Sequence, residues 1–156
     1  KANPFHLIIV CKSNTTSRVI MDYPFSDTAH TSPFFSWCFY HDSTVGGAIN
    51  VRCGSSNAVS GANDAWGSMR AYFYDPSSRD IYRNGTLFYN GASQNVAYTS
   101  NNALRIGCNG GTGEMFSGDI AEIILYNTAL GDSQIDGIAT YFNSKYALNI
   151  ATRGGG

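Results

Sequence analysis

The sequence of 156 residues predicts an all-β protein, a sandwich of two antiparallel sheets with one short helix near the C-terminal end. Short runs of β-branched and aromatic residues recur at regular intervals, and clusters of Gly, Ser, Asn, Asp and Pro separate them, as turns separate strands. Asn84-Gly85 lies between two such runs and is a strong signal for a two-residue hairpin. Only 13% of the residues are charged, against about 25% in ordinary soluble proteins.

Nine strands are expected, each bounded by turn residues. In chain order they are Phe5–Cys11, Arg18–Tyr23, Phe34–His41, Ala48–Cys53, Met69–Asp75, Asp80–Arg83, Thr86–Asn90, Leu104–Cys108 and Asp119–Tyr126. Many short strands with this punctuation indicate a two-sheet sandwich.

One helix is predicted over Asp132–Ala147. Its apolar residues recur with helical spacing and form one stripe: Ile135, Ile138, Ala139, Phe142 and Tyr146. Gly131 is the expected N-cap, with Gln134 at the N3 position of a capping box and Leu130 packed onto Ile135. Gly137 inside the helix costs roughly 1 kcal/mol relative to Ala, so we expect packing rather than propensity to hold this helix on the sandwich.

The end of the chain carries the most specific pattern. Its matching residues are Phe116, Gly118 to Ile123, Tyr126, Asn127, Ala129 and Leu130, followed by Tyr141, Lys145, Tyr146 and Leu148. They resemble the closing strand and helix of the laminin-G-like group of concanavalin A-like jelly rolls. Met69 to Phe88, Leu104 to Gly107 and Phe5 to Lys12 are similar to earlier strands of that group. The resemblance implies a jelly-roll sandwich over nearly the whole chain.

We expect one domain over residues 1–149 and a flexible Gly-rich tail over 150–156. The chain starts at Lys1, without Met or a signal peptide, which we interpret as a mature or trimmed segment of something longer. The resemblance also implies a first strand that would precede Phe5, and Lys1 begins too late to contain it. We therefore expect another part of a larger protein to cover the sheet edge that this strand would leave open.

Charge and composition argue against several classes of partner. The net charge is −1, so no electrostatic footprint for nucleic acid or an anionic membrane is present. No apolar run reaches the length of about 18 residues that would indicate a membrane-inserted helix. A composition low in charge and rich in Tyr, Ser and Asn is typical of extracellular or virion surfaces.

The four cysteines show no C-x-x-C spacing, which argues against a zinc site. We expect them to be buried thiols that act as small hydrophobes: Cys11, Cys38, Cys53 and Cys108. Cys38 and Cys53 flank the predicted turn Asp42 to Gly47 almost symmetrically, so one cross-strand disulfide is the alternative.

The two acids of the last predicted strand give the most direct test of a catalytic role. Retaining glycoside hydrolysis needs two carboxyl groups about 5–5.5 Å apart, and acids on one strand share a face only at even spacing. Asp119 and Glu122 are three positions apart, so we expect them on opposite faces and a hydrolase is disfavoured. Glu122 shares a face with apolar residues and is expected to be a half-buried structural acceptor that bonds a backbone or Arg group; a ligand contact is the alternative. His6, in an apolar strand, is expected to be a hydrogen-bonded structural histidine.

No cofactor is expected. Calcium is the alternative, because Asp119 follows Gly118 at a strand end. A calcium site needs six or more oxygen ligands, and the sequence does not assemble them from the available acids: Asp22, Asp27, Asp42, Asp64 and Asp119.

Binding is the function that remains. A lectin-like site stacks an aromatic ring on a sugar and pairs its hydroxyls with Asn, Asp and backbone groups, and it lies on loops or in a concave surface. The residues with this inventory are Asn57, Asn63, Asp64, Trp66, Tyr89 and Asn90. For Trp66 and Tyr89 the alternative is an ordinary place in the core or in a strand.

The sequence therefore predicts a non-catalytic recognition or attachment module of a larger extracellular or virion protein that binds glycan or protein. The alternative is a structural decoration or tail component of a phage-like particle without a sugar site, and a glycoside hydrolase comes third.

Overall fold

The computed structural model describes residues 6–14, 18–24, 35–42, 48–54, 67–75, 78, 80–90, 104–108 and 115–154. Its strands are β1 (His6–Ser13), β2 (Arg18–Pro24), β3 (Phe35–Asp42), β4 (Ala48–Gly54), β5 (Arg70–Tyr74), β6 (Ile81–Arg83), β7 (Thr86–Tyr89), β8 (Arg105–Ile106) and β9 (Gly118–Tyr126), and its helix is α1 (Asp132–Tyr146). All nine predicted strands and the helix are confirmed, with ends that differ by one or two residues from the predicted bounds.

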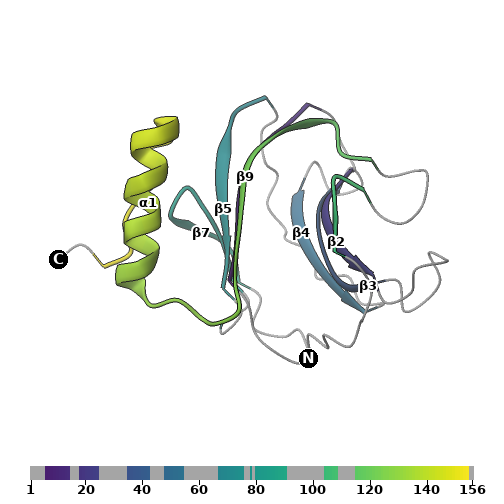
Figure 1. Ribbon diagram of the computed structural model, residues 1–156, viewed down its shortest axis with the longest axis horizontal. Coiled ribbons are helices and arrows are strands. Elements are labelled where there is room, and N and C mark those ends of the chain that lie inside the picture. Colours follow the sequence, from purple (N-terminus) through teal and green to yellow (C-terminus); the bar gives the residue numbers. More distant parts are fainter. Residues whose placement is uncertain are drawn as a thin grey trace. The chain divides into compact units, whose positions relative to one another are not determined.

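The strands form two sheets, which belong to two compact units of the chain. The helix unit holds α1 and a five-stranded sheet in the order β7-β6-β5-β1-β9, and Figure 1 shows α1 running beside this sheet. The second unit holds a four-stranded sheet in the order β4-β3-β2-β8. Strand β1 thus lies between β5, from the middle of the chain, and β9, from near its end, so this part of the sheet joins segments that are far apart in the sequence.

Strands β1 and β5 form the centre of the five-stranded sheet. They pair antiparallel, with Ile8 opposite Phe73 and Val10 opposite Ala71. Consecutive residues of both strands are buried, so both faces of the sheet are covered at this point. A strand buried on both faces has no need of a polar alternation, which explains the continuous apolar run from Leu7 to Cys11.

The apolar stripe of α1 packs on one face of this sheet, which we call the helix-side face. The buried residues of this cluster are Ile8, Val10, Ala71 and Phe73 from the sheet, with Leu130, Ile135, Ala139, Phe142 and Ile150 from the helix and its flanks. The Phe73 and Phe142 rings meet edge to face with centroids 6.3 Å apart. Each large apolar side chain buried in this way contributes about 1.5–3 kcal/mol. Packing therefore holds the helix, as its sequence predicts.

The ends of α1 have the expected local chemistry. The Gln134 side chain accepts a hydrogen bond from the Gly131 N–H at 3.0 Å, which confirms the predicted capping box. Leu130 and Ile135 are buried in one cluster, as expected of residues that flank this cap. At the other end Ala147 adopts a left-handed conformation with φ of 54°, and its N–H donates to the Asn143 carbonyl.

The sheet of the second unit is antiparallel. Its register places Cys38 opposite Arg52, so Cys38 and Cys53 are not direct partners in the ladder, and a register shift separates this pair from Phe35 and Gly54. Cys11 is buried, as predicted, whereas Cys108 is only half-buried. The disulfide alternative for Cys38 and Cys53 stays a prediction.

The residues that follow α1 are tied to the rest of the helix unit. We call residues 150–154 the C-terminal strap. Ile150 is buried, and its N–H and carbonyl bond the Asn143 side chain at 2.6 and 2.9 Å. The Ala151 N–H donates to the Asn84 carbonyl in the β6–β7 turn. These contacts hold the start of the predicted tail to the helix unit, while the domain bounds and the flexible tail itself stay predictions.

The strap makes Gly85 a sensitive position. Gly85 has φ of +82°, and a Cβ placed there would overlap the backbone of Ala151. We expect Gly85→Ala to lower the free energy of unfolding by about 2–4 kcal/mol, since backbone strain and overlap add. Gly67→Ala is the matched control, because Gly67 has φ of +83° and nothing within 4 Å. Urea denaturation should show the larger loss for Gly85→Ala; equal losses would mean that the strap does not press on the turn.

Gly137 offers the opposite test. It lies inside α1 with φ in the ordinary range, and a Cβ there would meet nothing within 4 Å. Gly137→Ala should therefore raise the free energy of unfolding by about 0.5–1 kcal/mol, through higher helix propensity and a less flexible unfolded chain. A thermal melt that shows no increase in Tm would contradict this reading of the helix.

Candidate functional site

The structure describes two of the six residues predicted to contact a ligand. Tyr89 is half-buried at the end of β7, opposite Ile81 of β6, and the exposed Asn90 follows it directly. The other four, Asn57, Asn63, Asp64 and Trp66, lie outside the described residues. The structure therefore describes only the Tyr89 and Asn90 part of the predicted site. That the six residues lie together stays a prediction.

The strand that carries Tyr89 is at an edge of the five-stranded sheet in the described part of the chain. Leu87 on the same strand is 49% exposed. The Arg83 guanidinium lies 4.6 Å from the centroid of the Phe88 ring, an arrangement typical of a cation–π contact. An edge with an exposed apolar side chain and half-buried aromatic rings next to a polar Asn has the mixed character that sugar contact requires.

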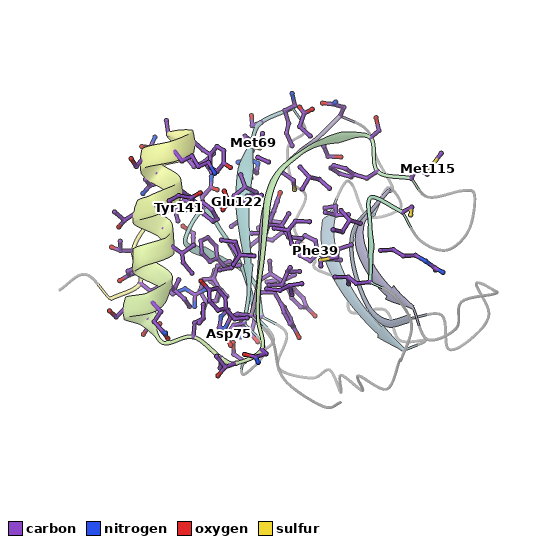
Figure 2. The ribbon with its side chains drawn as sticks, viewed as in Figure 1. Phe39, Met69, Asp75, Met115, Glu122 and Tyr141 are labelled. Atoms are coloured by element: carbon purple, nitrogen blue, oxygen red, sulfur yellow. The ribbon has the colours of Figure 1, made fainter. Side chains whose placement is uncertain are left out.

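The two acids of β9 serve different structural partners. The Asp119 carboxylate is 59% exposed and lies 2.8 Å from the Lys12 ammonium of β1. The Glu122 carboxylate is 21% exposed and faces α1, where Figure 2 shows it beside Tyr141. The two carboxylates thus bind partners on different elements, Asp119 on β1 and Glu122 on α1. Their placement on opposite faces of the sheet stays a prediction from strand alternation.

Glu122 accepts three hydrogen bonds from α1 at one oxygen. Its Oε2 lies 2.8 Å from the Tyr146 hydroxyl, 2.9 Å from Lys145 Nζ and 3.2 Å from the Tyr141 hydroxyl. We call these four residues the Glu122 cluster. The cluster joins β9 to α1 at the rim of the helix-side core, and it confirms Glu122 as a half-buried structural acceptor. Its partners are a Lys and two Tyr rather than the expected backbone or Arg group.

The electrostatics of the cluster follow from these contacts. Partial burial works to raise the pKa of Glu122, but the hydrogen bonds from Lys145, Tyr146 and Tyr141 outweigh it and hold the pKa below its ordinary value. The hydrogen bonds with Tyr141 and Glu122 raise the pKa of Lys145. Glu122 and Lys145 are therefore both charged at neutral pH, and their ion pair joins β9 to α1.

His6 is a second polar group inside the helix unit. Its side chain is fully buried, and Nδ1 accepts a hydrogen bond from the Leu130 N–H at 2.9 Å. This confirms His6 as a hydrogen-bonded structural histidine. It links the first strand of the chain to the connection between β9 and α1.

The described residues contain no group of three or more His, Cys, Asp or Glu side chains arranged to hold a metal ion. Of the acids considered for calcium, Asp119 is paired with Lys12, while Asp27 and Asp64 lie outside the described part of the chain. In the described part there is also no helix with the length and apolarity needed to cross a membrane.

Sequence reasoning missed the partners of these buried polar groups. Tyr141 and Lys145 are four positions apart on one helix face, and this spacing was the available signal for a cluster around Glu122. No spacing in the sequence indicated the contact that Arg153 makes. Its guanidinium lies 3.5 Å from the centroid of the Tyr82 ring, a contact between segments far apart in the sequence.

Comparison with known proteins identifies the fold. A family model described as the concanavalin A-like lectin/glucanases superfamily matches residues 8–136. A search of curated protein sequences finds no match to the chain.

Several solved structures share the fold at low sequence identity. Domain 4 of AbnA, an extracellular arabinanase from Geobacillus stearothermophilus, in complex with arabinotriose, has a TM-score of 0.64 at 16% identity over 88% of this chain and 66% of that chain. The CBM40 of the Ruminococcus gnavus IT-sialidase, bound to α2,3 sialyllactose, has a TM-score of 0.62 at 13% identity over 88% and 82%. The NanB sialidase from Streptococcus pneumoniae has a TM-score of 0.62 at 16% identity over 86% and 24%.

The chain thus spans 24% of the NanB sialidase chain and 66% of the arabinanase domain. At these identities the likeness establishes the fold alone. Together with the two antiparallel sheets and the single described helix, the matches confirm the predicted all-β fold class.

The Glu122 cluster gives a pH-dependent prediction. Glu122→Gln should lower the free energy of unfolding by about 1 kcal/mol at neutral pH, because the charge-assisted bonds become neutral. The folded pKa of Glu122 is depressed, so its contribution is present above its ordinary pKa of 4.5 and is lost as the pH falls through the folded value. Urea denaturation at a series of pH values should show the variant and the wild type converging in acid; a constant difference would contradict the role of the charge.

Proposed function

The match over residues 8–136 shows that the chain belongs to the concanavalin A-like lectin/glucanases superfamily, and we propose that it acts as a non-catalytic, lectin-like module that binds glycan as part of a larger extracellular protein. The observation that carries the proposal is that two similar structures are single domains with an oligosaccharide bound, one with arabinotriose and one with α2,3 sialyllactose. Each matches 88% of this chain, so the likeness extends over nearly all of it.

The arrangement of the acids supports a non-catalytic role. Glu122 is occupied by three hydrogen bonds from α1, and Asp119 by Lys12 on another strand. A general acid needs a raised pKa and access to the scissile bond. Glu122 has a lowered pKa instead and faces the helix.

The ligand contacts proposed for this module are the six predicted ones. Trp66 would stack on a sugar ring, and the other five would bond hydroxyl groups or border the ring: Asn57, Asn63, Asp64, Tyr89 and Asn90. Support comes from β7, where Tyr89 is half-buried and Asn90 is exposed at a sheet edge that also presents Leu87. Apart from Asp64, these contacts are uncharged donors, acceptors and rings, which suit a ligand recognised through hydroxyl groups.

Glycan-array screening followed by calorimetry tests the proposal. The folded wild-type chain should bind at least one class of oligosaccharide. Trp66→Ala should weaken that binding by about tenfold or more, which corresponds to about 1.4 kcal/mol, and Tyr89→Ala should weaken it by a smaller factor. The matched control is Tyr141→Ala, because Tyr141 is an exposed aromatic residue of the Glu122 cluster, outside the proposed contacts.

The control should retain wild-type affinity, and circular dichroism should show that all variants are folded. A blank array with folded wild-type protein would refute glycan binding and would favour the alternative of a structural component of a phage-like particle. Binding that Trp66→Ala and Tyr89→Ala leave unchanged would refute the proposed contacts while the function stands.

A further inference from the structure

Four separate segments of the helix unit meet around His6. His6 begins β1, Leu130 precedes α1, Asp75 follows β5 and Arg153 belongs to the C-terminal strap. His6 Nδ1 accepts from the Leu130 N–H at 2.9 Å, and His6 Nε2 lies 4.0 Å from Asp75 Oδ2. Arg153 Nη1 lies 3.8 Å from the same Asp75 oxygen. Figure 2 shows Asp75 at the end of the sheet where the chain leaves β9 for α1.

This junction requires a neutral imidazole. A nitrogen that accepts a hydrogen bond carries no proton, so the proton of neutral His6 is on Nε2, on the side of Asp75. Burial lowers the pKa of His6, Asp75 opposes this effect, and Arg153 adds to it. The charged or titratable groups that face the imidazole are thus Asp75, from the end of β5, and Arg153, from the strap.

The strap depends on the same carboxylate. It runs back along α1, because Ile150 bonds Asn143 and the Arg153 N–H bonds the Asp136 carboxylate nearer the start of the helix at 2.7 Å. The Arg153 side chain, 10% exposed, then lies over the Tyr82 ring and beside Asp75. Both the start of α1 and the end of the strap are therefore held next to His6.

We propose that His6 is an acid-sensitive latch, whose protonation releases the start of α1 and the C-terminal strap from the five-stranded sheet. A proton added at Nδ1 removes the acceptor of the Leu130 N–H. The Nδ1–H and the Leu130 N–H are then two hydrogen-bond donors that face each other. The imidazolium then donates from Nε2 to Asp75 and competes with Arg153 for that carboxylate. One protonation thus weakens both attachments, and the surface it uncovers is the helix-side face with Ile8, Val10 and Phe73.

The direction of the pH dependence follows from linkage. Because the fold holds His6 below its ordinary pKa of 6.5, the unfolded or released state binds the proton more readily. The latch is fully engaged above about pH 6.5 and weakens as the pH falls below that value. The equilibrium between latched and released states can shift by at most about tenfold for each pH unit.

Hydrogen exchange measured by mass spectrometry at about pH 7.5 and about pH 5 tests the latch, with exchange rates corrected for their intrinsic pH dependence. Wild-type protein should lose protection selectively over residues 127–154 at the lower pH. His6→Asn should abolish this loss, because the Asn oxygen accepts from the Leu130 N–H and does not titrate. His41→Asn, on β3, is the matched control and should behave as wild type.

A loss of protection that persists in His6→Asn, or that spreads evenly over the chain, would refute the latch. Where His6→Asn does not fold, nitrogen NMR of the wild-type imidazole decides the question. The proposal requires the Nε2–H tautomer at neutral pH and a titration midpoint that coincides with the loss of protection over residues 127–154. An Nδ1–H tautomer, or a titration without any change in protection, would overturn it.

Discussion

The structure of the helix unit depends on one contact, the packing of the α1 stripe on the helix-side face of β1 and β5. The helix has little intrinsic stability, because Gly137 lies inside it and isolated helices of this length are marginal in water. Phe142, Ile135 and Ala139 are buried only because the strands beneath them present Ile8, Val10 and Phe73. The Glu122 cluster and the strap depend on this packing, since the cluster joins α1 to β9 and the strap joins the end of α1 to the β6–β7 turn.

Polar groups around this contact join the strands, the helix and the strap to one another. Glu122 joins β9 to the C-terminal part of the helix, and Asn143 joins the helix to the strap. His6 joins β1 to Leu130, the residue before the helix N-cap. A carboxylate at a rim of this kind would otherwise be a plausible catalytic acid. Its hydrogen bonds lower its pKa and direct it at α1, which is the reverse of what a general acid needs.

The elements could be predicted because their causes are local. Strand ends follow turn residues, the helix follows its apolar spacing, and the alternation of β9 places Glu122 with Ile124 on the helix-side face. The strap could not be predicted, because Arg153-Gly154-Gly155-Gly156 has the composition of a linker, while Arg153 is held by Tyr82, Asp75 and Asp136 from elsewhere in the chain. The ligand contacts were predicted from residue type alone, since loops such as the one before Trp66 carry no periodicity that fixes their geometry.

The contacts of the charged side chains bear on how the proposed glycan could be bound. In the described part of the helix unit, the charged side chains Lys12, Asp119, Glu122, Lys145 and Arg153 are all engaged in contacts between elements. Charged residues make up only 13% of the whole chain. The proposed glycan contacts accordingly rely on aromatic rings and on amide groups, with Asp64 as the one charged residue among them. At the β7 edge, Leu87 and Tyr89 lie outside the helix-side cluster, so these residues can vary without disturbing the α1 contact. The proposed contacts of this edge and the packing of α1 therefore occupy separate parts of the helix unit.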